Sequence, residues 1–157
     1  MTTLRIIAAI MICIVAVPAL AQDKPADNMD IVREALAAQK KLLISENLPL
    51  TEDEATAFWP IYEEFQAALK TTNDADMKVI EEFAQYYNTD TMTDEIAEKL
   101  IKKSMANKGE RLKLQDKYFS KFLKAIPAKK VARYYQLENK VRAVIDYDLA
   151  SQIPLID

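Results

Sequence analysis

Histidine is absent from this chain of 157 residues, and cysteine and glycine occur once each, as Cys13 and Gly109. Without histidine the chain has no serine or cysteine triad built on an imidazole, no usual zinc site and no haem ligation by histidine. One glycine cannot supply the tight turns of an antiparallel sheet protein, because those turns need residues that tolerate positive φ. These absences exclude catalytic and metal sites built on histidine and predict an all-α fold.

The first 21 residues have the pattern of a cleavable signal peptide. Arg5 precedes an apolar run, and Ala19-Leu20-Ala21 supplies the small residues that a signal peptidase accepts. We expect cleavage after Ala21, which leaves residues 22–157 as a single periplasmic or secreted domain without a stable membrane anchor. An uncleaved anchor is the alternative, but the apolar run is short for a membrane-spanning helix. Cleavage also removes Cys13, so the stability of the mature protein must come from packing.

Apolar periodicity and start and stop signals predict four to five long helices. The expected helices cover residues 29–46, 52–87 and 94–126, and a last helix begins at Pro127 and ends before Pro154. Residues 23–30 are expected to form a polar leader. The third helix would span ~50 Å at about 1.5 Å per residue, so we expect an elongated bundle. Its apolar side is marked by Ile96, Leu100, Ile101, Leu112, Tyr118, Phe119, Phe122 and Leu123.

Residues 50–62, LTEDEATAFWPIY, carry the strongest local signal. Thr51 is expected to cap the second helix through its hydroxyl, while Glu54 reaches back to the backbone of Thr51 and Leu50 packs onto the first turn. Thr93 offers a second cap, at the start of the third helix. Past the first cap, the aromatic residues predicted to belong to the core are Phe58, Trp59 and Tyr62.

Pro60 lies inside the second predicted helix. Its ring removes the hydrogen bond to the Thr56 carbonyl and crowds that group. We therefore expect a bend of more than about 20°, or a short interruption of the helix, close to Trp59.

Charge is divided unevenly along the chain. Residues 22–97 contain 6 Lys and Arg against 17 Asp and Glu, whereas residues 98–140 contain 13 against 4. One interpretation is that acidic and basic helices attract each other within the fold or across a dimer. The other is that a basic helix face binds acidic or unfolded partners, and helical spacing favours one stripe for that role. The candidate partner-binding residues of this stripe are Lys113, Lys117, Lys121 and Lys124.

Other kinds of site are only weakly indicated. Residues 73–76, NDAD, suggest a calcium loop, but the required Gly and the terminal Glu are missing. The basic segment could attract nucleic acid, yet it is predicted to be helical and has no sheet of stacking aromatic residues. We therefore expect no metal, no cofactor and no nucleic-acid partner. Glu138 and Arg142 are spaced for a structural ion pair on the last helix.

The first cap, Leu50-Thr51-Glu52-Asp53-Glu54, resembles the LTxxQ motif of the Spy/CpxP family of periplasmic proteins, with Glu54 where the family usually has Gln. A second copy, MTDEI, stands at residues 92–96. Residues 57–65 and 127–144 are similar to an uncharacterised branch of that family. The resemblance implies a helical domain, a cradle-shaped antiparallel homodimer, and action as an ATP-independent chaperone or as a modulator of envelope-stress signalling.

Two functions are therefore kept as hypotheses. The first is a non-enzymatic periplasmic binding protein for unfolded or envelope proteins, acting as a chaperone or stress-response modulator. The alternative is a structural or regulatory module that binds one specific envelope protein. Promiscuous binding calls for exposed apolar patches rimmed by charge, whereas a module with one partner can present a single defined groove.

Overall fold

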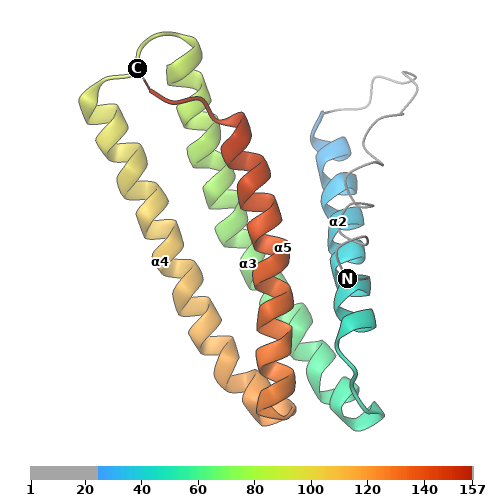
Figure 1. Cartoon of the computed structure of the whole chain (residues 1–157). Helices are drawn as coiled ribbons and strands as arrows, with labels where there is room; N and C mark the ends of the chain where they lie inside the picture. Colours follow the sequence, from blue (N-terminus) through green and yellow to red (C-terminus); the bar gives the residue numbers. More distant parts are fainter. Residues whose placement is uncertain (1–24, 157) are drawn as a thin grey trace. The chain divides into compact units, whose positions relative to one another are not determined.

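Four helices form the part of the chain that the computed structural model describes, residues 25–156 (Figure 1). They are α2 (Pro25–Asn47), α3 (Glu52–Asn88), α4 (Asp94–Ala125) and α5 (Ala128–Gln152). No strand occurs among the described residues, so the all-α prediction is confirmed. The predicted signal peptide lies outside the described residues. The polar leader expected over residues 23–30 is wrong from Pro25 onward, because α2 begins there.

The chain divides into two compact units, residues 1–39 and 40–157, and the boundary falls within α2. Of the first unit, the structure describes residues 25–39, all of them helical. The second unit contains the last turns of α2, from Lys40 onward, together with α3, α4 and α5. The contacts discussed below all lie within this second unit.

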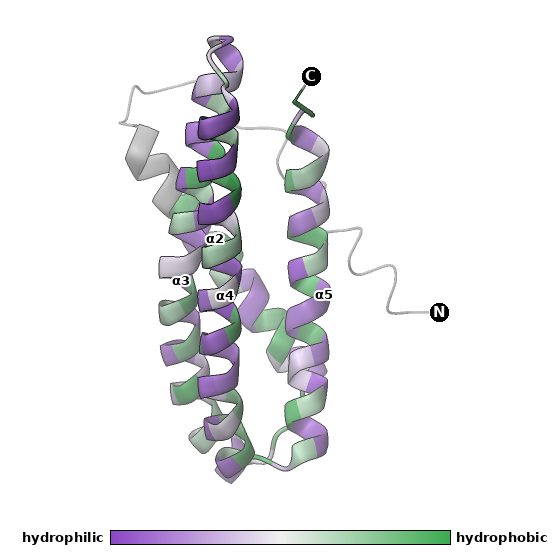
Figure 2. Ribbon diagram, turned by 90° about the vertical axis from the view of Figure 1, so that its left-hand side faces the viewer, coloured by the Kyte–Doolittle hydropathy of each residue, from purple (hydrophilic) through white to green (hydrophobic). Residues whose placement is uncertain are grey.

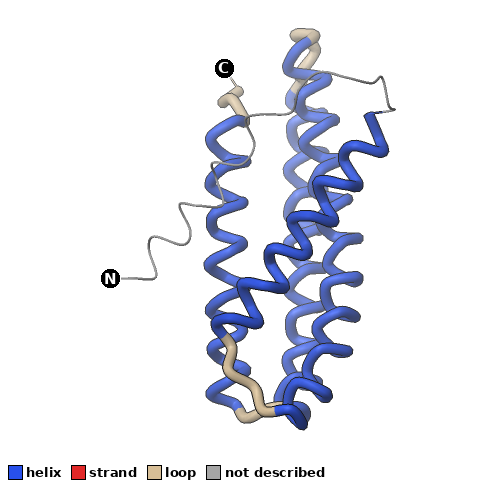
Figure 3. Tube along the Cα trace, turned by 90° about the vertical axis from the view of Figure 1, so that its right-hand side faces the viewer, coloured by secondary structure: helices blue, strands red, loops and turns tan. Residues whose placement is uncertain are grey.

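Within the second unit α3 and α4 run antiparallel to each other, and α5 turns back at the end of α4 (Figures 1 and 3). The connection from α2 to α3 and the turn from α4 to α5 lie at the same end. A hydrogen bond from Nε of Arg133 to the carbonyl oxygen of Asn47 joins α5 to the end of α2 there. Hydrophilic and hydrophobic residues alternate along the helices at helical spacing (Figure 2), as expected of amphipathic helices that share a core.

One aromatic cluster forms the core at that end. The ring of Phe58 lies 5.3 Å from that of Phe122 and 5.1 Å from that of Tyr134, measured between centroids, so α3, α4 and α5 meet around one side chain. Trp59 is only partly buried and packs against the cluster from its edge. The buried residues of the cluster are Ile44, Leu48, Phe58, Tyr62, Phe65, Leu69, Tyr118, Phe122, Ile126, Val131 and Tyr134.

The helix ends follow the local chemistry of the sequence. The Thr51 hydroxyl accepts from the backbone N–H of Glu54, and the Glu54 carboxylate accepts from the backbone N–H of Thr51, which completes a capping box. Thr93 caps α4 by accepting from the N–H of Ile96. Pro127 stands at the N-cap of α5 rather than inside its first turn, so the last helix begins one residue later than predicted.

α3 continues without a break through Pro60, so the short interruption predicted as one alternative is wrong. The helix can continue because proline removes only one backbone hydrogen bond, and a small local shift of the backbone relieves the contact between its ring and the Thr56 carbonyl. The polar residues 71–74 are also helical. The bend at Pro60 stays a prediction.

Candidate functional site

Ion pairs join the acidic helix α3 to the basic helix α4. Nζ of Lys103 lies 2.6 Å from the Glu82 carboxylate, and Nζ of Lys121 lies 2.7 Å from that of Glu64. Lys130, at the start of α5, pairs in the same way with Glu54 of the capping box. The uneven charge of the sequence is therefore partly matched inside the fold, as the first interpretation of the charge division expects.

These pairs shift the acidity of their carboxyl groups. Hydrogen bonds from Lys130, Lys121 and Lys103 hold the pKa of Glu54, Glu64 and Glu82, respectively, below the usual value of 4.5. In return, the hydrogen bond to Glu64 raises the pKa of the Lys121 ammonium. Each of these groups is held in its charged form by its partner.

Part of the predicted lysine stripe is engaged in contacts within the chain. Lys121 is bound to Glu64, and its Nζ lies 4.7 Å from the centre of the Tyr118 ring. Lys117 lies 5.4 Å from the same ring. Lys113 pairs with Glu110 on its own helix, 2.7 Å away, and Lys124 is exposed in the last turn of α4. The stripe therefore contributes internal contacts as well as exposed charge, and its role in partner binding stays a prediction.

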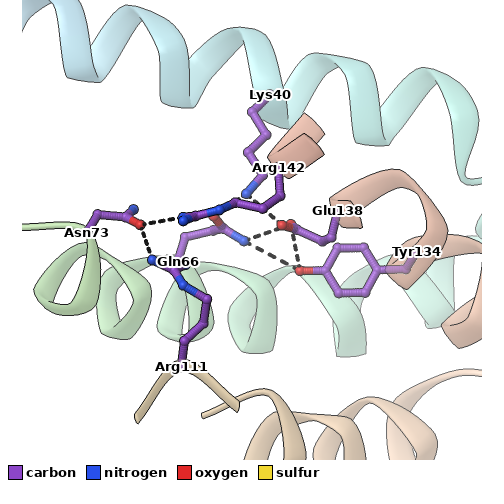
Figure 4. Close-up of polar contacts among 7 residues, drawn as sticks. All are labelled: Lys40, Gln66, Asn73, Arg111, Tyr134, Glu138 and Arg142. Carbon is purple, nitrogen blue, oxygen red and sulfur yellow. Dashed lines mark hydrogen bonds and ion pairs between the residues drawn. The ribbon is translucent and has the colours of Figure 1, made fainter. Parts of the chain in front are cut away.

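A polar network that the sequence did not indicate connects α2, α3 and α5 (Figure 4). Its centre is Glu138, which is 9 % exposed. One of its oxygens lies 2.7 Å from Nζ of Lys40, and the other accepts hydrogen bonds from Nε2 of Gln66, at 2.9 Å, and from the hydroxyl of Tyr134, at 3.0 Å. Three donors surround this carboxylate, as a buried charge requires.

The predicted pair between Glu138 and Arg142 is wrong. Arg142 instead binds Asp146, one turn further along α5, at 2.6 Å, and extends toward α3. There, both Arg142 and Arg111 contact the side-chain oxygen of Asn73, at 3.4 Å and 2.7 Å, and the carboxylate of Asp76 (Figure 4). Glu138 pairs with Lys40 because packing turns it into the interior, where the end of α2 supplies a nearer cation.

The chemistry of this network is structural. Burial raises the pKa of Tyr134, and the neighbouring Glu138 carboxylate raises it further. Burial also raises the pKa of Tyr135 to about 12. Both hydroxyls are engaged as donors, Tyr134 to Glu138 and Tyr135 to the carbonyl oxygen of Gln115. The network therefore holds neutral tyrosines and a buried, hydrogen-bonded carboxylate in fixed positions.

A shallow hollow lies between α3 and α4, away from the aromatic cluster. It has a volume of about 250 Å³ and is lined by Ala75, Lys78, Val79, Glu82, Lys103, Ala106 and Asn107. The amide nitrogen of Asn107 is buried and has no hydrogen-bond partner among the described residues. No sequence signal indicated this unsatisfied nitrogen.

Several large apolar side chains are exposed on α4. Of the apolar side predicted for this helix, Leu100, Tyr118 and Phe122 are buried. Five residues on the adjoining face are between 42 % and 67 % exposed. We call this set the α4 stripe, and it consists of Ile101, Met105, Leu112, Phe119 and Leu123.

The C-terminal part of α5 is also open to solvent. No residue of α5 after Glu138 is buried, although apolar residues continue to its end. We call the exposed apolar residues of this region the C-terminal patch, and it consists of Val144, Ile145, Tyr147, Leu155 and Ile156. They surround the end of α5 rather than share one face, because residues two apart in a helix, such as Ile145 and Tyr147, point to different sides. Single exposed apolar residues are ordinary, but groups of them are typical of surfaces that bind other proteins.

The described residues offer neither a metal site nor a membrane span. No group of three or more metal-binding side chains comes together among the described residues. None of the described helices combines the length and apolar character that crossing a membrane requires. In comparisons with known proteins, no family model, curated protein or solved structure matches the chain.

Proposed function

We propose that this chain is an exported, non-enzymatic binding protein that holds unfolded segments of other proteins, as a chaperone or as a modulator of envelope stress. The observation that carries the proposal is the C-terminal patch. Its side chains include Tyr147 at 76 % and Leu155 at 87 % exposure, next to charged residues such as Asp146 and Asp148. Apolar side chains rimmed by charge suit weak contacts with many apolar segments.

Further features agree with this proposal without testing it. The two capped helix starts, at Thr51 and Thr93, are the motifs in which the chain resembles the Spy/CpxP family. The signal-peptide pattern of residues 1–21 indicates the periplasm or secretion, and the mass of the mature protein would test a start at Gln22. Our proposal includes a homodimer, unfolded or envelope proteins as partners, and a bend of α3 at Pro60.

The test is suppression of aggregation for several unrelated unfolded proteins, with the full chain in excess. Wild-type protein should suppress aggregation of more than one client. An Ile145→Ser, Tyr147→Ser variant should lose most of this effect, because it removes apolar surface that is exposed in the free protein. The matched control is Ala143→Ser with Ala150→Ser, which changes two exposed alanines of the same helix. No suppression of any client by wild-type protein would contradict the proposal.

A module for one specific envelope partner is the second candidate, and the hollow with the buried Asn107 nitrogen favours it. An inserted apolar side chain would pack on the alanines of the hollow. A backbone carbonyl of the partner could accept from that nitrogen once binding has displaced the atoms that cover it. Binding that is abolished by Ala106→Leu and insensitive to the changes at residues 145 and 147 would favour this candidate over the first. The reverse pattern would favour the first.

A further inference from the structure

The spacing of the apolar residues in the α4 stripe is symmetric about Leu112. Met105 and Phe119 each stand seven residues from Leu112, and Ile101 and Leu123 each stand eleven residues away. Separations of seven and eleven residues return to the same side of an α-helix, so the five apolar side chains share one face. A helix face with this symmetry is self-complementary when a second copy of it is turned end to end.

The charged residues of this face have the same symmetry with opposite signs. Lys108 and Asp116 each stand four residues from Leu112, on opposite sides. Both are exposed, and neither forms an ion pair with its own chain among the described residues. In an antiparallel pair of α4 helices centred on Leu112, Lys108 of each copy would face Asp116 of the other. In a parallel pair, Lys108 would face Lys108 and Asp116 would face Asp116, which is repulsive.

The surface beside the stripe is open. The space where a Cβ atom of Gly109 would stand has no heavy atom within 4 Å, so a second helix backbone can approach there. The C-terminal tail of the same chain does not cover the stripe, because its own apolar residues Leu155 and Ile156 are 87 % and 51 % exposed. Both observations favour a second chain as the occupant.

We propose that a second copy of this chain packs on the α4 stripe, antiparallel, with Leu112 on the two-fold axis. Met105 of one copy then contacts Phe119 of the other, and Ile101 contacts Leu123. An interface of this kind is isologous and closes at two chains. The inference rests on the homodimer of the proposed function and adds its interface, and it leaves the C-terminal patch free for clients.

Cysteine cross-linking in a Cys13→Ala background tests the register. On mild oxidation Leu112→Cys should give a covalent dimer, because a residue on the axis faces itself. Two copies of residue 105 would lie fourteen residues apart along the helices, about 21 Å, which is beyond the reach of a disulfide. Met105→Cys and Phe119→Cys should therefore fail to cross-link alone and should cross-link when they are mixed.

The matched control is Ser120→Cys, which places a thiol on an exposed part of α4 next to the stripe and should give no covalent dimer. Self-cross-linking of Met105→Cys would mean a parallel pair and would overturn the register. A monomeric mass for wild-type protein at every concentration tested, together with no cross-link at Leu112→Cys, would overturn the interface itself.

A charge exchange gives a second, independent test that leaves the apolar stripe intact. Lys108→Asp and Asp116→Lys should each weaken the dimer about tenfold in sedimentation experiments, because each places like charges together. The variant with both changes should return to within a few-fold of wild type. A double variant as weak as the single ones would overturn the pairing. Circular dichroism checks that the variants stay helical.

The mass of the protein and its covalent linkage are measured without a client. Failure of client binding would therefore leave both tests of the interface unaffected.

Discussion

The ammonium nitrogen of Lys40, near the end of α2, lies 2.7 Å from the carboxylate of Glu138 on α5. Their side chains are 20 % and 10 % exposed, so water screens this pair little. Lys40 also donates to Gln66, at 2.8 Å, and Gln66 donates in turn to Glu138. The end of α2 is thus fixed to both α3 and α5 through one carboxylate.

Replacement of Lys40 by Met should destabilise the protein by about 2 to 4 kcal/mol, because it leaves the Glu138 carboxylate without a cation in a largely buried place. The measurement is the free energy of unfolding from urea denaturation. Lys102→Met is the control, since Lys102 pairs with Glu98 at the surface, and its loss should cost less than about 1 kcal/mol. Equal losses of unfolding free energy for the two variants would mean that the buried pair of Lys40 and Glu138 stabilises the fold no more than a surface ion pair does.

Thr51→Ala should cost about 1 kcal/mol of stability, because the backbone N–H of Glu54 loses its hydroxyl acceptor. Thr56→Ala removes the same atoms one turn later, where the hydroxyl only donates to a carbonyl oxygen of the same helix. That control should be neutral or slightly stabilising because of the higher helix propensity of alanine. Urea denaturation of both variants compares them directly, and equal effects would contradict a capping role for Thr51.

Acid should destabilise the protein through its surface ion pairs. The folded-state pKa of Glu64 is lowered from 4.5 by its hydrogen bond with Lys121, so the pair contributes stability above pH 4.5. That contribution is lost as the pH falls through the folded-state pKa of Glu64. Glu64→Gln should therefore flatten the fall of unfolding free energy below pH 4.5. A pH profile parallel to that of wild type would show that the pair does not contribute.

Alkali should destabilise the protein through its buried tyrosines. Burial raises the folded-state pKa of Tyr134 above its ordinary value of 10, so its stabilising effect is complete below pH 10 and is lost as the pH rises further. Tyr134→Phe should reduce the loss of unfolding free energy above pH 10. Tyr147→Phe changes an exposed ring and is the control. Identical alkaline profiles for wild type and Tyr134→Phe would contradict this assignment.

Pro60→Ala should straighten α3. Alanine restores a backbone N–H that can donate to the Thr56 carbonyl, and it removes the ring that crowds that carbonyl. Residual dipolar couplings of the amides on either side of residue 60 give the angle between the two halves of the helix. We expect an angle above about 20° in wild type and a smaller one in the variant. The same angle in both proteins would mean that proline does not bend α3.

Local sequence signals predicted the helices well. The predicted start at Glu52 follows from the capping box of Thr51 and Glu54, and the predicted start at Asp94 follows from Thr93. Both features are local, because caps act within one turn of the helix end. Proline is favoured in a first helical turn, but the start at Pro25 was missed because the polar residues after it have no apolar periodicity.

The sequence did not predict which side chains meet across helices. Periodicity places Glu138 on a helix face, but it does not say that Lys40 lies opposite. Periodicity also grouped Leu112 with Leu100 on one apolar side of α4, although of these two residues only Leu100 is buried. That side of the helix is wider than the surface that α3 covers. The division between covered and open residues depends on how the helices pack, which follows from contacts distant in sequence.

The core cluster has a consequence for how the second unit opens. Its buried residues gather where α4 turns into α5, whereas the stretch from Met77 to Asn88 contains none. Amide hydrogens there should exchange with solvent through fluctuations that leave the aromatic cluster intact, so their exchange would report a smaller free energy than global unfolding. The hairpin of α3 and α4 should therefore open first next to its connecting loop, residues 89–93, while the opposite end, which contains the aromatic cluster, stays packed.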